Sequence, residues 1–82
     1  MAENNTQGRN DEVSYVVDEH IGILSTSGTG WSKELNLIAW NGRGQKYDIR
    51  DWSPEHKKMS RGITLNEDEA KALYELLKTR FE

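Results

Sequence analysis

The feature that most limits the fold is the alternation of side chains between residues 40 and 65, which is typical of a β-hairpin followed by its exit loop. Successive side chains of a strand point to opposite faces, so residues two apart share a face. One face of the strand expected at 45–52 carries Lys46, Asp48, Arg50 and Trp52; the other carries Tyr47, Ile49 and Asp51. A face with tryptophan, arginine and lysine suits a single-stranded nucleic acid, because bases stack on flat rings and cations follow the phosphates. The alternative is an ordinary solvated face, since surface Arg and Lys are common.

The chain has 82 residues, enough for one domain. Residues 1–12 hold almost nothing apolar, so we predict a disordered tail there and a folded domain at 13–82. Only 34% of the residues are hydrophobic and none is cysteine, so the core is small and no disulfide reinforces it. Association with a second copy is then the obvious further source of buried surface. No apolar run approaches a membrane span and no signal peptide is visible, so we expect a cytoplasmic location and no membrane partner.

The net charge of −3 is unusual for a protein that binds nucleic acid, but the charge is unevenly distributed. Residues 43–61 contain six cations and three anions, a local balance of +3, so the rest of the chain carries −6. Screening over about 8–10 Å lets a local basic face act in spite of a negative total. The charge therefore permits a nucleic-acid partner at this segment.

Four strands are expected, at 13–27, 31–40, 45–52 and 62–65. Gly22 in the first indicates a bulge or bend. Asn41-Gly42 marks a tight hairpin because both residues tolerate positive φ, and Pro54 stops the third strand because it cannot donate to a ladder. In the second strand, the residues expected to face the core are Leu35, Leu37 and Ala39. The residues expected to join the face of Lys46 and Arg50 are Asn36, Ile38 and Trp40.

A helix follows the last strand. Asn66 is a good N-cap, and Glu69 three residues later completes the pattern of a capping box. The helix carries one apolar stripe, at Ala70, Leu73, Tyr74, Leu77 and Phe81. We interpret this stripe as covering the sheet and also as pairing with a second copy, through Leu73, Tyr74, Leu77 and Phe81. The alternative is that it only covers the sheet.

Catalysis is poorly supported by the sequence. Cysteine is absent, and His20 and His56 lack a spacing typical of metal ligands. Asp48 and Asp51 point to opposite faces and are interpreted as ion-pair partners that orient the nearby cations. We therefore expect no enzyme activity, no metal or other cofactor, and no small-molecule substrate.

The run Y-D-I-R-D-W, the polar loop with Lys58, and R-G-I-T-L-N before a capped helix together resemble the positive cofactor four family of single-stranded DNA-binding transcriptional coactivators. The sequence is most similar to the bacterial, YdbC-type branch, and the resemblance covers residues 31–80. It implies an α+β fold with a curved four-stranded antiparallel sheet followed by one C-terminal helix (ββββα). It also implies that two copies pair through their helices and bind single-stranded or melted DNA with little sequence preference.

The resemblance also assigns residues to the binding site. It places an aromatic residue before the hairpin at Trp40, a basic turn residue at Arg43, the arginine of D-I-R at Arg50, the following aromatic at Trp52, and basic residues at Lys58 and Lys33. Alternation adds Asn36 and Lys46. The chain departs from the family at Trp31, where a cation is expected, so that Trp31 is either a stacking residue or part of the core.

Two other partners stay open. An RNA-binding module is the nearest alternative, because stacking surfaces accept either sugar. A protein-interaction domain that uses the same aromatic face is the other, and it predicts weak salt dependence. For a DNA-binding homodimer, the expected role is in transcription regulation or in DNA replication and repair, and the expected location is the bacterial cytoplasm, associated with the nucleoid.

Overall fold

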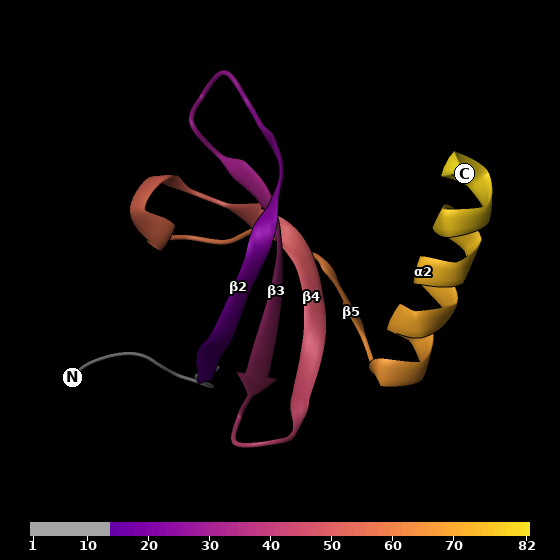
Figure 1. Ribbon diagram of the computed structural model, residues 1–82. Coiled ribbons are helices and arrows are strands. Elements are labelled where there is room, and N and C mark those ends of the chain that lie inside the picture. Colours follow the sequence, from indigo (N-terminus) through magenta and orange to yellow (C-terminus); the bar gives the residue numbers. More distant parts are fainter. Residues whose placement is uncertain (1–13) are drawn as a thin grey trace.

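A computed structural model describes residues 14–82, and the tail predicted at 1–12 lies outside the described residues. The elements are β2 (Tyr15–Thr26), β3 (Ser32–Trp40), β4 (Gln45–Trp52), a short 3-10 turn η1 (Pro54–His56), β5 (Ile63–Leu65) and α2 (Glu67–Phe81). The four strands form one antiparallel sheet in the order β2-β3-β4-β5, and α2 follows it (Figure 1). The predicted ββββα fold is confirmed. No helix within residues 14–82 is long and apolar enough to cross a membrane.

The β3–β4 hairpin forms where the sequence predicts it. Asn41 and Gly42 have φ values of 51° and 75°, in the left-handed region that asparagine and glycine tolerate. The backbone N–H of Arg43 donates to the carbonyl of Trp40 at 2.8 Å and closes the turn. The tight turn therefore leaves Trp40 at one end of β3 and Arg43 at the tip of the hairpin.

Strand β2 forms one edge of the sheet and is irregular along its length. Its pairing with β3 shifts register between Val17 and Glu19, between His20 and Gly22, and between Ile23 and Ser25. The sequence predicts the irregularity at Gly22 from the glycine, whereas the other two register shifts have no glycine that would indicate them. The bulges bend the strand and change which side chains reach each face.

Helix α2 begins with the predicted capping box. The side chain of Asn66 accepts a hydrogen bond from the Glu69 backbone at 2.8 Å, and the Glu69 carboxylate accepts one from the Asn66 backbone at 2.8 Å. Two of the N–H groups that a helix start leaves unpaired are thereby satisfied. Because both contacts are local, the helix start is set by its own sequence.

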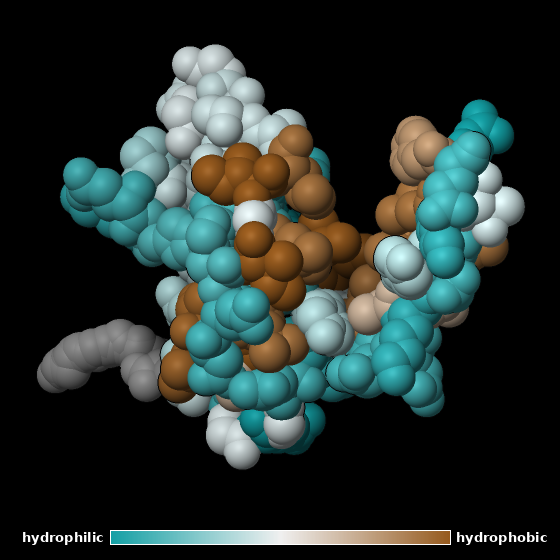
Figure 2. All heavy atoms as spheres, viewed as in Figure 1, coloured by the Kyte–Doolittle hydropathy of each residue, from teal (hydrophilic) through white to brown (hydrophobic). Residues whose placement is uncertain are grey.

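The most buried side chains lie on the sheet face that the sequence assigned to nucleic acid. They are Ile38, Trp52, Asn36 and Asp48. The other face, expected to be the core, holds Leu35 and Ile49 only half-buried. Between that face and α2 lies an open apolar groove of about 520 Å³. Its walls are formed mainly by Leu24, Leu35, Tyr47, Ile49, Leu65, Leu73, Tyr74 and Leu77. Figure 2 shows hydrophobic side chains on the strands and on the side of α2 turned toward them.

Candidate nucleic-acid interface

A second groove, of about 450 Å³, lies on the opposite face of the sheet near the β3–β4 hairpin. Its lining residues are Trp40, Asn41, Arg43, Gly44, Lys46, Arg50, Met59 and Thr64. Four predicted site residues, Trp40, Arg43, Lys46 and Arg50, therefore meet in one place. Asn41, Met59 and Thr64 also line it and were not predicted, because they carry neither charge nor an aromatic ring.

The register of the sheet explains why these residues converge. Ile38 of β3 is opposite Lys46 of β4, and Asp48 of β4 is opposite Thr64 of β5. Directly opposed residues in antiparallel strands lie on the same face, and residues two apart along a strand share that face. Lys46, Asp48 and Arg50 therefore lie on the face of Trp40, as the alternation predicts.

Arg50 is held tightly against this face. Its Nε and Nη2 donate to the two carboxylate oxygens of Asp48, each at 2.7 Å. Its Nη1 donates to the backbone carbonyl of Ser60 at 3.3 Å. Its guanidinium carbon lies 4.8 Å from the centre of the Trp40 ring. Asp48 is fully buried, so the predicted role of Asp48 as an ion-pair partner that orients a cation is confirmed.

The close approach of the following loop depends on Gly62. A Cβ at this position would collide with the carbonyl oxygen of Ile49 and with the side chain of Arg50. The missing side chain lets the segment after Ser60 pass directly over Arg50. Glycine at this position thus allows the segment to approach β4 closely at Ile49 and Arg50.

Trp52 does not lie where a stacking residue is needed, and this prediction is corrected. It is 1% exposed, and its ring stacks on that of His56 with 4.2 Å between centroids and 8° between planes. Tyr15 lies between the two tryptophans, 5.5 Å from Trp40 and 5.8 Å from Trp52. Because the loop of η1 folds back over Trp52, this ring belongs to the core and presents no free face to a base.

Three other predicted site residues lie outside the groove. Asn36 is fully buried and bonded to its neighbours, so it cannot contact a ligand on the surface. Lys33 is opposite Asp51 on the other face of the sheet, and its Nζ lies 3.3 Å from the Asp51 carboxylate. Lys58 is exposed on the loop after η1 but does not line the groove. The prediction that Asn36 contacts the nucleic acid is therefore wrong. Lys33, which the resemblance placed at a basic position of the site, lies on the face opposite Trp40.

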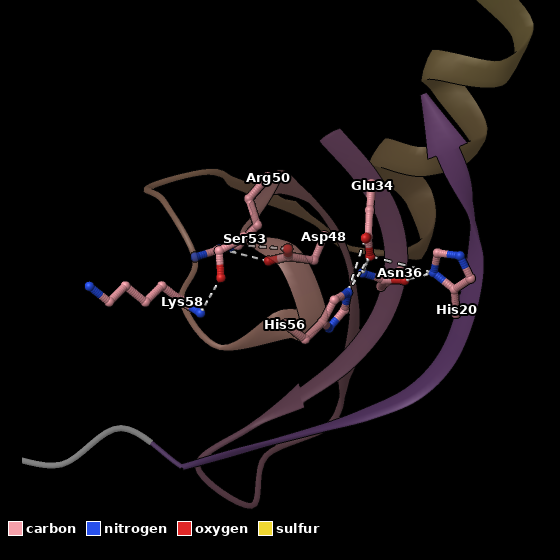
Figure 3. A network of polar contacts seen from close by, with 8 residues as sticks. All are labelled: His20, Glu34, Asn36, Asp48, Arg50, Ser53, His56 and Lys58. Atoms are coloured by element: carbon pink, nitrogen blue, oxygen red, sulfur yellow. Dashed lines mark hydrogen bonds and ion pairs between the residues drawn. The ribbon is translucent and has the colours of Figure 1, made fainter. Parts of the chain in front are cut away.

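A polar network joins His56 of η1 to strands β3 and β2 (Figure 3). Its centre is Glu34, a carboxylate residue only 5% exposed. His56 Nε2 lies 2.8 and 3.0 Å from its two oxygens, and Asn36 donates to it at 3.2 Å. His20 Nδ1 is 2.7 Å from the Asn36 side-chain oxygen. Within residues 14–82 no group of three or more His, Cys, Asp or Glu is arranged to hold a metal ion.

Two comparisons place the chain among known proteins. Residues 27–76 match the sequence pattern of the family described as "Transcriptional Coactivator p15 (PC4)". The matched segment spans most of the sheet and most of α2. The chain is also similar to an uncharacterized protein of Treponema pallidum (strain Nichols), with 56% identity over 68 residues. That match covers 83% of this chain and 80% of the Treponema protein.

Proposed function

This chain belongs to the family of Transcriptional Coactivator p15 (PC4), a family of nucleic-acid-binding and non-enzymatic proteins, and from that premise we propose that it binds single-stranded DNA in the groove of Trp40 and Arg50. We propose residues 13–82 as the single-stranded DNA-binding domain. The observation that carries the proposal is the half-buried Trp40 ring with a guanidinium held beside it, in a groove that the cations Arg43 and Lys46 also line. This arrangement combines a surface for stacking bases with charges for phosphates.

The cations of the groove have different roles in this proposal. Arg50 is neutralised by Asp48, so it extends the stacking surface of Trp40 rather than pairing with a phosphate. Arg43 and Lys46 are exposed and have no ion-pair partner within residues 14–82. Pairing with phosphates therefore falls to these two. Stacking gives affinity without sequence preference, because every base has a flat face.

Tryptophan fluorescence tests the proposal directly. Titration with an oligo-dT of about twenty nucleotides should quench the emission, because a base stacked on Trp40 changes the surroundings of its ring. The matched duplex should have a small effect, and affinity should fall steeply with salt. An RNA oligomer of the same length distinguishes the two sugars. No response to any nucleic acid would favour the protein-interaction domain instead.

A pair of lysine variants tests which face binds. Lys46→Ala should weaken binding and lower the slope of log K against log salt by about 0.7, the value for one phosphate on a single strand. Lys33→Ala removes the same charge from the opposite face and serves as the matched control. Its slope should equal that of the wild type. An equal loss in both variants would contradict the assignment of the groove.

We further propose that the chain acts as a homodimer, with the apolar groove and α2 as the interface. Leu73, Tyr74, Leu77 and Phe81 stay exposed by 37 to 81% in the single chain. Contiguous apolar surface of this kind typically marks an interaction site. A second copy presents the same surface, and pairing buries the apolar residues of both copies at once, since a two-fold interface is self-complementary. Two binding grooves in one particle would then hold a single strand by avidity.

Sedimentation tests the dimer. Wild-type protein at micromolar concentration should sediment as a dimer, and Leu77→Glu should sediment as a monomer because it places a charge in the apolar groove. Thr79→Glu puts the same charge on the same helix outside the groove lining and should leave the dimer intact. A monomeric wild type would rule out the interface.

The proposed partner implies a place in the cell. A protein that binds single-stranded DNA would act in the bacterial cytoplasm, with the nucleoid, wherever strands are separated. Transcription regulation and DNA replication or repair both expose such strands. Binding by stacking serves each of them equally well.

A further inference from the structure

We propose that His56 is a positioning residue of the nucleic-acid groove: it anchors the loop Ser53–Ser60, whose far end forms a wall of the groove and holds Arg50. This inference rests on the proposed function and assigns a role to a residue outside the groove. It draws on the polar network of Figure 3, on two strained residues, and on the contacts at each end of the loop.

The side chain of His56 is the anchor of the loop. His56 stacks flat on the buried Trp52 and places Nε2 within 3.0 Å of both oxygens of Glu34. A buried carboxylate is unfavourable unless hydrogen-bond donors surround it. Asn36 supplies one donor at 3.2 Å, and His56 supplies the shorter contact. The same imidazole thus bonds to Glu34 and stacks on Trp52, and these two contacts together fix the position of the ring.

The backbone beside the anchor is strained. Glu55 and His56 both have left-handed conformations, with φ of 63° and 58°. Residues with a Cβ adopt this region seldom, and they keep it where the surroundings hold them in place. Neither residue is glycine. The His56 backbone N–H donates to the Ser53 carbonyl at 2.9 Å, and the His56 ring adds the contacts to Trp52 and Glu34. Loss of the ring contacts should therefore release the turn to other conformations.

The loop connects this anchor to the groove. Two hydrogen bonds between Ser53 and Lys58 close it at its base: Ser53 N–H donates to the Lys58 carbonyl at 2.9 Å, and the Ser53 side-chain Oγ accepts from Lys58 N–H at 2.7 Å. The next two residues reach the binding face. Met59 lines the groove, and the Ser60 carbonyl accepts from Arg50 at 3.3 Å. Ser60 lies only four residues after His56 and is also bonded to Asp51 of β4, while Met59 pairs with Trp52. A displaced turn therefore pulls on both Met59 and Ser60 against these bonds.

The experiment measures oligo-dT affinity of the full chain with substitutions at His56. His56→Phe keeps a ring for Trp52 but removes the donor to Glu34. The released loop must then be ordered again when DNA binds, and we expect this cost to weaken binding about tenfold, within the free energy of one hydrogen bond to a charged group. His56→Gln can still donate to Glu34 and should recover part of the loss. Nuclear magnetic resonance signals of Met59 and Ser60 should shift in His56→Phe, which reports the loop directly.

Coupling to Arg50 separates positioning from general loss of stability. In an Arg50→Ala background the Ser60 contact no longer exists, so His56→Phe should cost less than it does in the wild type. A merely structural role predicts that the two losses multiply. If His56→Phe does not fold, the same cycle with His56→Gln decides. Equal affinity of folded His56→Phe and wild type, or losses that multiply, would overturn the inference alone; absence of binding by the wild type would overturn the proposed function and this inference together.

Discussion

Replacing Trp52 by alanine should unfold the domain, whereas replacing Trp40 by alanine should leave it folded and remove most of its affinity for single-stranded DNA. Trp52 is 1% exposed and packs against Tyr15 and His56. Truncating a buried tryptophan to alanine costs about 3–5 kcal/mol, and the whole stability of a small domain is about 5 kcal/mol. Trp40 instead forms a wall of the groove, and losing one stacked base costs about 1–3 kcal/mol of binding free energy.

Two measurements separate these effects. Circular dichroism during urea titration gives the free energy of unfolding, and anisotropy of a labelled oligo-dT gives the affinity of each folded variant. Trp40→Phe keeps a smaller ring and should bind between the wild type and Trp40→Ala. A stable Trp52→Ala variant that no longer binds DNA would reverse the roles assigned to the two tryptophans.

The second large effect is expected at Asp48. In Asp48→Ala, Arg50 keeps its charge while only 13% of its side chain is exposed, and nothing replaces the two short hydrogen bonds. Breaking a buried ion pair by removing one partner costs about 3–5 kcal/mol, because the remaining charge is left without compensation. We expect Asp48→Ala to be strongly destabilised in urea titrations.

Removing both partners should separate stability from binding. The double variant Asp48→Ala, Arg50→Met has no unpaired charge, and apolar replacements of buried pairs are often as stable as the original. We expect it to regain most of the free energy of unfolding but not the affinity for oligo-dT, because the guanidinium beside Trp40 is gone. If Asp48→Ala proves as stable as the wild type, the pair is not the support of this face that its geometry indicates.

Local patterns made much of the fold predictable. The capping box at Asn66 and Glu69 and the hairpin at Asn41 and Gly42 depend on residues within a few positions of one another. The alternation from 45 to 52 sorted side chains correctly between the two faces of the sheet. It also brought Trp40, Lys46 and Arg50 together, because residues that share a face of paired strands are neighbours in space.

Burial was not predictable in the same way. Alternation predicts which face of the sheet Trp52 lies on, but not which segment covers that face. The segment is the loop of η1, and its fold depends on the contact of His56 with Glu34, 22 positions earlier. Neither histidine has a motif spacing, so the network was missed. The only sequence signal was the unusual presence of Glu34 and Asn36 on the face of Ile38, where a core strand would have apolar residues. Lys33 entered the predicted site through the family resemblance alone, and it lies on the face opposite Trp40.

The irregular edge strand β2 affects whether the chain aggregates with other chains in a crowded solution. An edge of twelve residues with unpaired backbone groups is a template onto which a strand of another chain can add, and such addition begins aggregation. The three register shifts of β2 interrupt the even spacing that an incoming strand needs, and the adjacent acidic residues Asp18 and Glu19 add repulsion. These bulges protect a small sheet that, among the residues described, has no helix or loop over this edge.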